Sequence, residues 1–79
     1  MSLTDDLLRI SRTRRSLPPP AVARSIRHSA DVTQAELAAA LEVDRVTVAR
    51  WEIGTRVPRG ELRLRYVELL ERLAAEGGT

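Results

Sequence analysis

Arginine is the residue type in this chain whose chemistry is most informative. All 13 basic residues are arginine, and the formal net charge is only +2. The arginines gather in two runs, six within residues 7–28, where there is no acid, and six within residues 45–65, where there are two acids. Because a planar guanidinium group suits bidentate contacts to phosphate and guanine, this distribution indicates nucleic acid. The alternative is that the arginines fill ordinary surface positions.

Other chemistry is poorly supported. The chain has no cysteine and one histidine, His28, so disulfides and thiolate metal sites are excluded and His28 has no partners for a metal or catalytic site. There is no glycine-rich phosphate loop and no plausible carboxylate pair. We therefore predict no enzymatic activity, no cofactor, no metal and no small-molecule substrate.

Length and hydropathy limit the class of protein. Seventy-nine residues make one domain, close to the smallest size at which a core is stable without metals or disulfides. No apolar run approaches the about 20 residues of a membrane span, and there is no signal-peptide segment. The lack of cysteine suits a reducing compartment. We expect a cytoplasmic protein without a membrane association.

Helix signals begin near the N-terminus. Thr4, followed by two aspartates, predicts a helix over about residues 5–15. Its apolar positions, at helical spacing, are Leu3, Leu7 and Ile10. The prolines at 18–20 end this helix, and Pro20 can open the next, which runs to about Ala30. That second helix has Val22 and Ile26 one turn apart.

The centre of the chain contains two short helices. Thr33 and Glu36 form a capping box that opens a helix over Gln34–Leu41. Asp44 offers a further cap for a helix that ends near Ile53, where Gly54 accepts the positive φ of a helix C-terminus. A last helix covers about residues 60–75. Its apolar stripe is Leu62, Tyr66, Leu69, Leu70 and Leu73.

Only about three residues connect the two central helices, so the second must cross the first steeply, as in a helix-turn-helix. Leu37 and Ala38 line the first helix, and Val43 lies in the turn. No segment alternates with the period of a strand. We predict an all-α fold, a compact bundle of four to five helices. Residues 1–19 would form an N-terminal helix or arm with a proline linker, and residues 20–76 the helix-turn-helix domain.

The second central helix, about residues 45–53, has two different sides. At about 100° per residue, its inner side is formed by Val48, Trp51 and Glu52. Val46 and Arg50 lie nearly opposite, flanked by Thr47 and Ala49, with Arg45 at the exposed start. Arginine can bond guanine, and valine or alanine can meet a thymine methyl. The predicted base-facing residues are Arg45, Val46, Ala49 and Arg50. The alternative is that Val46 packs sideways against a neighbouring element.

The stretch IRHSADVTQAELAAALEVDRVTVARWEIGTRVP, residues 26–58, resembles the Cro and lambda-repressor class of helix-turn-helix domains, often called Xre-like. The resemblance rests on the Thr33–Gln34 start, the Glu36–Leu37–Ala38 run and the Trp51–Glu52–x–Gly54 ending. It implies a buried ion pair between Arg27 and Glu52. It also implies positioning or phosphate contacts, with Gln34 either touching phosphate or bracing the second helix. The residues concerned are Thr33, Gln34, Thr47, Thr55 and Arg56.

Three features depart from this family. Asp31 and Glu42 stand where the family often has glycine, and glutamate tolerates the left-handed conformation less well than aspartate, at about 1 kcal/mol of strain. The chain also offers one long helix after the motif in place of two short ones, and an extra helix before the prolines.

Together these features predict a sequence-specific DNA-binding transcriptional regulator, a small repressor of phage or mobile-element type that reads the major groove. One such helix reads few base pairs, so a homodimer is expected, formed through the last helix or the helix of residues 5–15. A first alternative is an antitoxin that autoregulates its operon and binds a toxin through residues 1–19. A second is a helical module without DNA binding.

Overall fold

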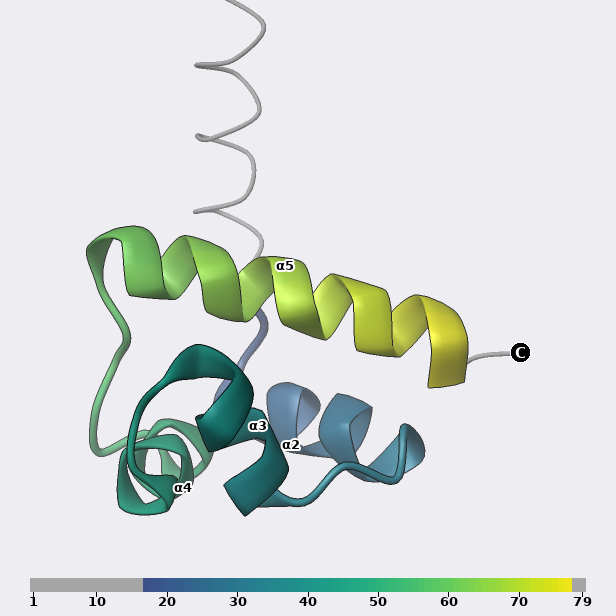
Figure 1. The fold of residues 1–79 in the computed structure, drawn as a ribbon, viewed down its shortest axis with the longest axis horizontal. Coiled ribbons are helices and arrows are strands. Elements are labelled where there is room, and N and C mark those ends of the chain that lie inside the picture. Colours follow the sequence, from purple (N-terminus) through teal and green to yellow (C-terminus); the bar gives the residue numbers. More distant parts are fainter. Residues whose placement is uncertain (1–16, 78–79) are drawn as a thin grey trace, which may run out of the picture.

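The computed structural model describes residues 17–77, so the helix expected over residues 5–15 lies outside the described part. Four helices occur there, and no strand: α2 (Pro20–Ser29), α3 (Gln34–Leu41), α4 (Arg45–Ile53) and α5 (Gly60–Gly77). Helices α2, α3 and α4 lie together, and the long α5 crosses over them (Figure 1). This all-α arrangement confirms the predicted fold class.

Local signals account for the helix boundaries. The Thr33 hydroxyl accepts a hydrogen bond from the Glu36 backbone N–H at 3.0 Å, and the Glu36 carboxylate accepts one from the Thr33 N–H at 2.9 Å, so the predicted capping box is present. Pro20 opens α2 as its first residue, where its missing N–H has no intrahelical partner to lose. Asp44 precedes α4 as expected, but its side chain makes no capping hydrogen bond.

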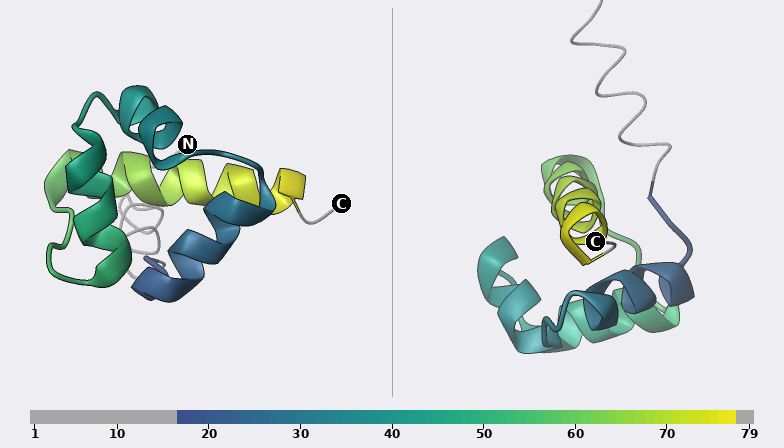
Figure 2. Two further views of the ribbon diagram at one scale, coloured as in Figure 1. Left: turned by 90° about the horizontal axis from the view of Figure 1, so that it is seen from below. Right: turned by 90° about the vertical axis from the view of Figure 1, so that its right-hand side faces the viewer.

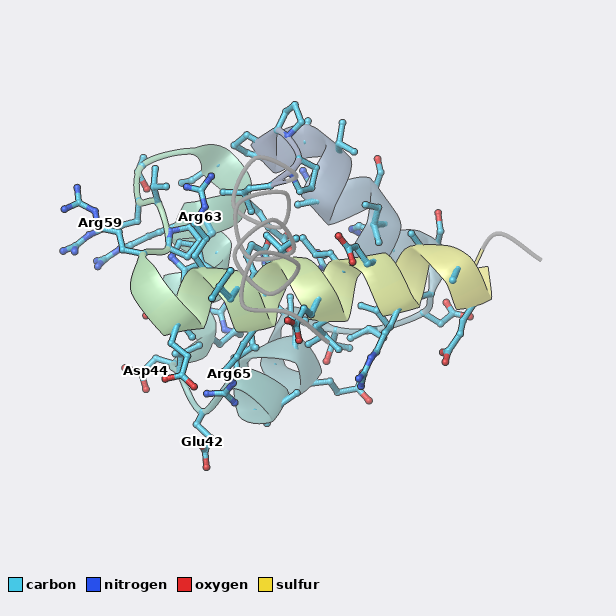
Figure 3. The ribbon with its side chains drawn as sticks, turned by 90° about the horizontal axis from the view of Figure 1, so that it is seen from above. Glu42, Asp44, Arg59, Arg63 and Arg65 are labelled. Carbon is cyan, nitrogen blue, oxygen red and sulfur yellow. The ribbon has the colours of Figure 1, made fainter. Side chains whose placement is uncertain are left out.

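Residues with positive φ make the short connections possible. Asp31 has φ 57° and Glu42 φ 58°, while Gly54 closes α4 with φ 83°. The αL conformation at Glu42 ends α3 and lets the Val43 N–H reach back to the Ala38 carbonyl at 2.9 Å. The Glu42 side chain extends away from the ribbon (Figure 3). The sequence-based concern about glutamate at this position is therefore correct.

The core forms where α5 covers the three shorter helices. The rings of Trp51 and Tyr66 are in contact, with centroids 4.7 Å apart. Helix α5 packs on α2 and α3, and α4 packs on both as well. The buried apolar side chains are Ala23, Leu37, Ala38, Leu41, Val48, Trp51, Tyr66, Val67 and Leu70. Two short helices that are only marginally stable alone are thus held by a shared core.

Two details of the core differ from the sequence pattern. Of the spaced pair on α2, Ile26 packs against the core whereas Val22 is 46% exposed. The fully buried positions of α2 are Ala23 and Arg27 instead. On α5, Val67 is completely buried although it was not assigned to the apolar stripe. In both cases the neighbouring helices, rather than helical spacing, decide which side chain is enclosed.

Replacing Glu42 by glycine should stabilise the domain by about 1 kcal/mol, because glycine has no Cβ to oppose the left-handed conformation. The measurement is the free energy of unfolding in urea. Glu42→Ala is the matched control, since it removes the carboxylate but keeps the Cβ and should give no such gain. An equal gain in both variants would show that loss of charge, and not relief of backbone strain, is responsible.

Candidate nucleic-acid interface

Helix α4 turns one side into the core and leaves the other uncovered. Val48, Trp51 and Glu52 are buried, whereas Arg45 and Arg50 are exposed. Val46 is 46% exposed, so the described part of the chain does not cover it. The half-buried Thr47 and Ala49 flank this surface. All four residues predicted to face bases therefore lie on the open side of α4 or at its margin.

Ile53 also belongs to this face, although in the sequence it marks only the end of the helix. It is 70% exposed and follows Val46 by seven residues, which places the two on the same side of α4. A full helical wheel would have found it. The exposed side of α4 thus combines two arginines with an apolar strip, a mixture suited to guanine edges and thymine methyl groups.

A buried ion pair joins α2 to α4. Arg27 and Glu52 are 6% and 5% exposed, and the guanidinium donates to both carboxylate oxygens, at 2.7 and 2.9 Å. Arg27 also donates to the backbone carbonyl of Val32 at 2.8 Å. The pairing that the resemblance implied is therefore present, in the bidentate geometry that makes such contacts strong.

The pair shifts the ionisation of both partners. Burial would raise the pKa of Glu52, but hydrogen bonds from Arg27 and Gln34 and the charges of Arg27 and Arg24 outweigh it, so the pKa lies below the ordinary value of 4.5. The hydrogen bond to Glu52 raises the pKa of Arg27. Because the folded pKa of Glu52 is depressed, its stabilisation is complete above pH 4.5 and is lost as the pH falls through the folded value.

Gln34 connects this pair to the exposed face. Its amide Nε2 donates to Glu52 Oε1 at 3.1 Å, and its Oε1 accepts a hydrogen bond from Arg45 Nη1 at 3.0 Å. Of the two roles that the resemblance implied for Gln34, the structure contains the bracing of the second helix. Thr33, next to it, is exposed, with its hydroxyl engaged in the capping box.

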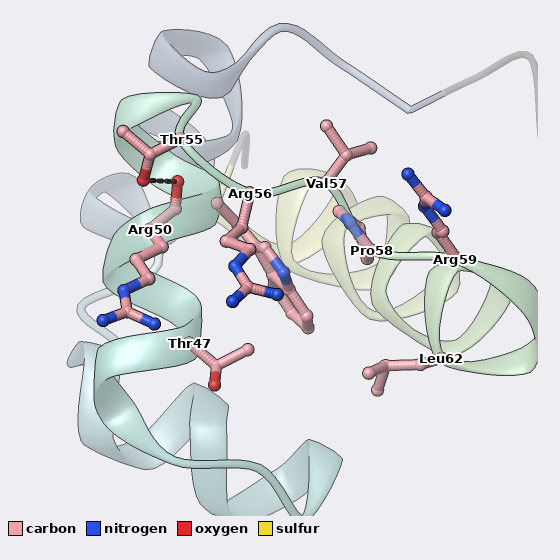
Figure 4. Close-up of a pocket in the computed structure, with 9 residues that line it drawn as sticks. Thr47, Arg50, Thr55, Arg56, Val57, Pro58, Arg59 and Leu62 are labelled. Atoms are coloured by element: carbon pink, nitrogen blue, oxygen red, sulfur yellow. Dashed lines mark hydrogen bonds between the residues drawn. The ribbon is translucent and has the colours of Figure 1, made fainter.

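An open groove of about 730 Å³ borders the other margin of α4. Thr47 and Arg50 line it from α4, and Thr55 and Arg56 from the following loop (Figure 4). The Thr55 backbone N–H bonds the Arg50 carbonyl at 3.0 Å, which holds the loop against the end of α4. The structure therefore brings four of the predicted site residues together around one concave, basic surface.

Arg59 lines the same groove and extends outward from it (Figures 3 and 4). Arg59 belongs to the second arginine run, but its place in the sequence does not indicate a particular role. The remaining lining residues are apolar or lie deeper: Trp51, Val57, Pro58 and Leu62. Only the fold shows that Arg59 and Arg50 line one groove, because the return of the chain after α4 brings them to it.

Two short helices joined by a tight turn, with the second exposing a basic and apolar face, define a helix-turn-helix domain. A comparison with protein-family models matches residues 24–75 to the Helix-turn-helix family, and the chain belongs to this family. Its general function is therefore that of a DNA-binding transcriptional regulator. Comparisons with curated proteins and with solved structures found no significant match.

Residues 17–77 contain no group of three or more histidine, cysteine, aspartate or glutamate side chains able to hold a metal ion. None of their helices combines the length and hydropathy needed to span a membrane.

Removing one member of the ion pair, as in Glu52→Ala or Arg27→Ala, should lower the free energy of unfolding by about 3–5 kcal/mol, because the remaining charge is left buried without its partner. The double replacement Arg27→Met with Glu52→Leu should cost less than either single change, since it removes both charges and keeps volume. Denaturant unfolding of the three variants measures this. A double variant less stable than both singles would contradict it.

Proposed function

We propose that this chain is a sequence-specific transcriptional repressor of phage or mobile-element type that inserts α4 into the major groove of its operator. The observation that carries the proposal is the orientation of α4. Its tryptophan and glutamate are enclosed, Val46 and Arg50 face outward, and Arg45 is exposed at the first residue of the helix. Bound over a promoter, such a domain would repress by occlusion.

The proposed contacts divide into two groups. Arg45, Val46, Ala49 and Arg50 meet base edges, where arginine reads guanine and the apolar side chains meet thymine methyl groups. The residues proposed to touch or face the phosphate backbone are Thr33, Gln34, Thr47, Thr55 and Arg56. The basic groove beside α4 supports this second group, because exposed guanidinium groups at its margin can neutralise phosphates and release counterions.

The proposed assembly is a homodimer. Helix α4 has nine residues, about 13 Å at 1.5 Å per residue, and reads only a few base pairs. Two copies on successive major grooves, about 34 Å apart, would supply the remaining affinity and specificity. Selection of bound duplexes from a random pool tests the proposal directly. A palindromic site would support a dimer, a single half-site would oppose it, and the absence of any enriched sequence would overturn the regulator itself.

Arg50→Ala should relax the base preference at one operator position and weaken specific binding by about 1–3 kcal/mol, because a bidentate contact to guanine is lost. Repeating the selection with the variant measures this. Arg72→Ala on α5 is the control, since it removes an exposed arginine from outside the proposed DNA contacts; because α5 is one of the two helices expected to form the dimer, the oligomeric state of the variant is measured in parallel. An equal loss for every duplex would remove Arg50 from the base-reading group.

Arg56→Ala should weaken binding to all duplexes alike and reduce the slope of log K against log salt by about 0.9, the contribution of one phosphate contact. Titrations at several salt concentrations, on the selected site and on an unrelated duplex, measure the slope. If the loss is confined to the selected site, Arg56 reads sequence rather than phosphate.

A further inference from the structure

Helix α2 carries a second exposed basic cluster, distinct from the groove beside the α4–α5 loop. Arg24, Ser25 and His28 are exposed and lie within one turn of each other. They line a concave surface of about 490 Å³, whose other residues are Ala21, Ser29 and Glu52. None of the proposed DNA-contacting residues belongs to this cluster. Glu52, the partner of Arg27, lines the same concave surface. We call Arg24, Ser25 and His28 the α2 cluster.

The α2 cluster contains one exposed cation, Arg24. Arg24 makes no hydrogen bond or ion pair within the described part of the chain, in contrast to Arg27, whose guanidinium is engaged with Glu52 and Val32. Helix α2 has no acid in its first turn and ends with basic side chains. Arg24 is thus an exposed cation of α2 whose guanidinium makes no hydrogen bond among the described residues, although its charge also acts on Glu52.

Contacts through Glu52 place the α2 cluster beside one margin of α4. Glu52 lines the concave surface and bonds Gln34, which in turn bonds Arg45. Arg45 and Glu52 are seven residues apart, so at about 100° per residue they lie within about 20° of each other on α4. The α2 cluster therefore adjoins the Arg45 side of the helix.

The open groove lined by Thr47, Arg50, Thr55 and Arg56 adjoins the opposite margin of α4. Thr47 and Arg50, which line it, are turned by about 140–200° from Arg45 at 100° per residue. In the left view of Figure 2, α4 lies between α2 and the segment that joins α4 to α5. The exposed face of α4 is consequently bordered by exposed arginines on both sides.

We propose that Arg24, Ser25 and His28 form a second phosphate-binding surface, which contacts the DNA strand across the major groove from the strand contacted by Arg56 and Arg59. The major groove is about 12 Å wide and an α-helix with its side chains about 10–12 Å, so a helix that fills it has one phosphate backbone along each margin. This inference rests on the proposed entry of α4 into the groove. It adds to the proposed function that each of the two basic surfaces contacts a different strand of the DNA.

The test uses the selected operator with single phosphates replaced, one at a time, by uncharged methylphosphonates. The wild-type chain should lose affinity at positions on both strands. Arg24→Ala should become insensitive to replacement at positions on one strand, and Arg56→Ala at positions on the other. Each variant should reduce the salt slope by about 0.9, and the double variant by about 1.8. Arg72→Ala should retain the wild-type pattern.

Two results would overturn the strand assignment. One is an unchanged salt slope and phosphate pattern for Arg24→Ala. The other is a loss of sensitivity on the same strand as Arg56→Ala. Because the charge of Arg24 also acts on Glu52, the unfolding of the variant is measured in parallel. A less stable variant with an unchanged slope would make Arg24 a partner of Glu52 only.

The design separates this inference from the proposed function. If the wild-type chain binds no duplex, both are wrong. If it binds its operator and Arg24→Ala behaves as wild type, only the α2 surface is wrong. Arg24→Lys keeps a positive charge without the guanidinium fork, and should restore most of the salt slope if the contact is to phosphate.

Discussion

The buried pair of Arg27 and Glu52 is the interaction on which the geometry of the exposed helix depends. Removing these two charges from water costs several kcal/mol each, and the pair tolerates this because the guanidinium meets both carboxylate oxygens and the Val32 carbonyl. Since one partner lies on α2 and the other on α4, the pair limits rotation of α4 about its own axis. A rotation that exposed Trp51 would also withdraw Glu52 from Arg27. The outward direction of Val46 and Arg50 therefore follows from a charge pair as well as from apolar burial.

The short connection between α3 and α4 imposes a second constraint on the fold. Helices α3 and α4 have eight and nine residues, too few to be stable alone, and each must meet the shared core within a short distance of the turn. The left-handed Glu42 permits this at the cost of backbone strain. Tyr66 and Leu70 of α5 then close the core over them. The long last helix thus stabilises two short helices that would not be stable alone.

Features encoded locally were predictable from the sequence, and features created by tertiary contacts were not. Thr33 with Glu36, and Gly54, mark helix ends through backbone chemistry within a few residues, so the limits of α3 and α4 were predicted correctly. Helical spacing did not predict the buried side of α2, because this side includes an arginine whose burial depends on a glutamate 25 residues away, and only the resemblance to a known family pointed to that pair. The surfaces to which Arg24 and Arg59 belong were not predictable for a similar reason. An arginine run shows charge, but only the packing of α2 and of the α4–α5 loop against α4 shows which arginines share a surface.

The hydrogen bonds of Gln34 show how bracing and phosphate contact can coexist. Its two partners also settle the orientation of its amide, because the Glu52 carboxylate only accepts and the Arg45 guanidinium only donates. One amide N–H is used toward Glu52, and the second has no partner among the described residues, which leaves it available to a phosphate oxygen. Meanwhile Arg45 is held by Gln34 in the absence of DNA, so less of its side-chain entropy, up to about 2 kcal/mol for an arginine, remains to be lost on binding. The same amide that links α4 to the buried pair would therefore lower the entropic cost of the base contact proposed for Arg45.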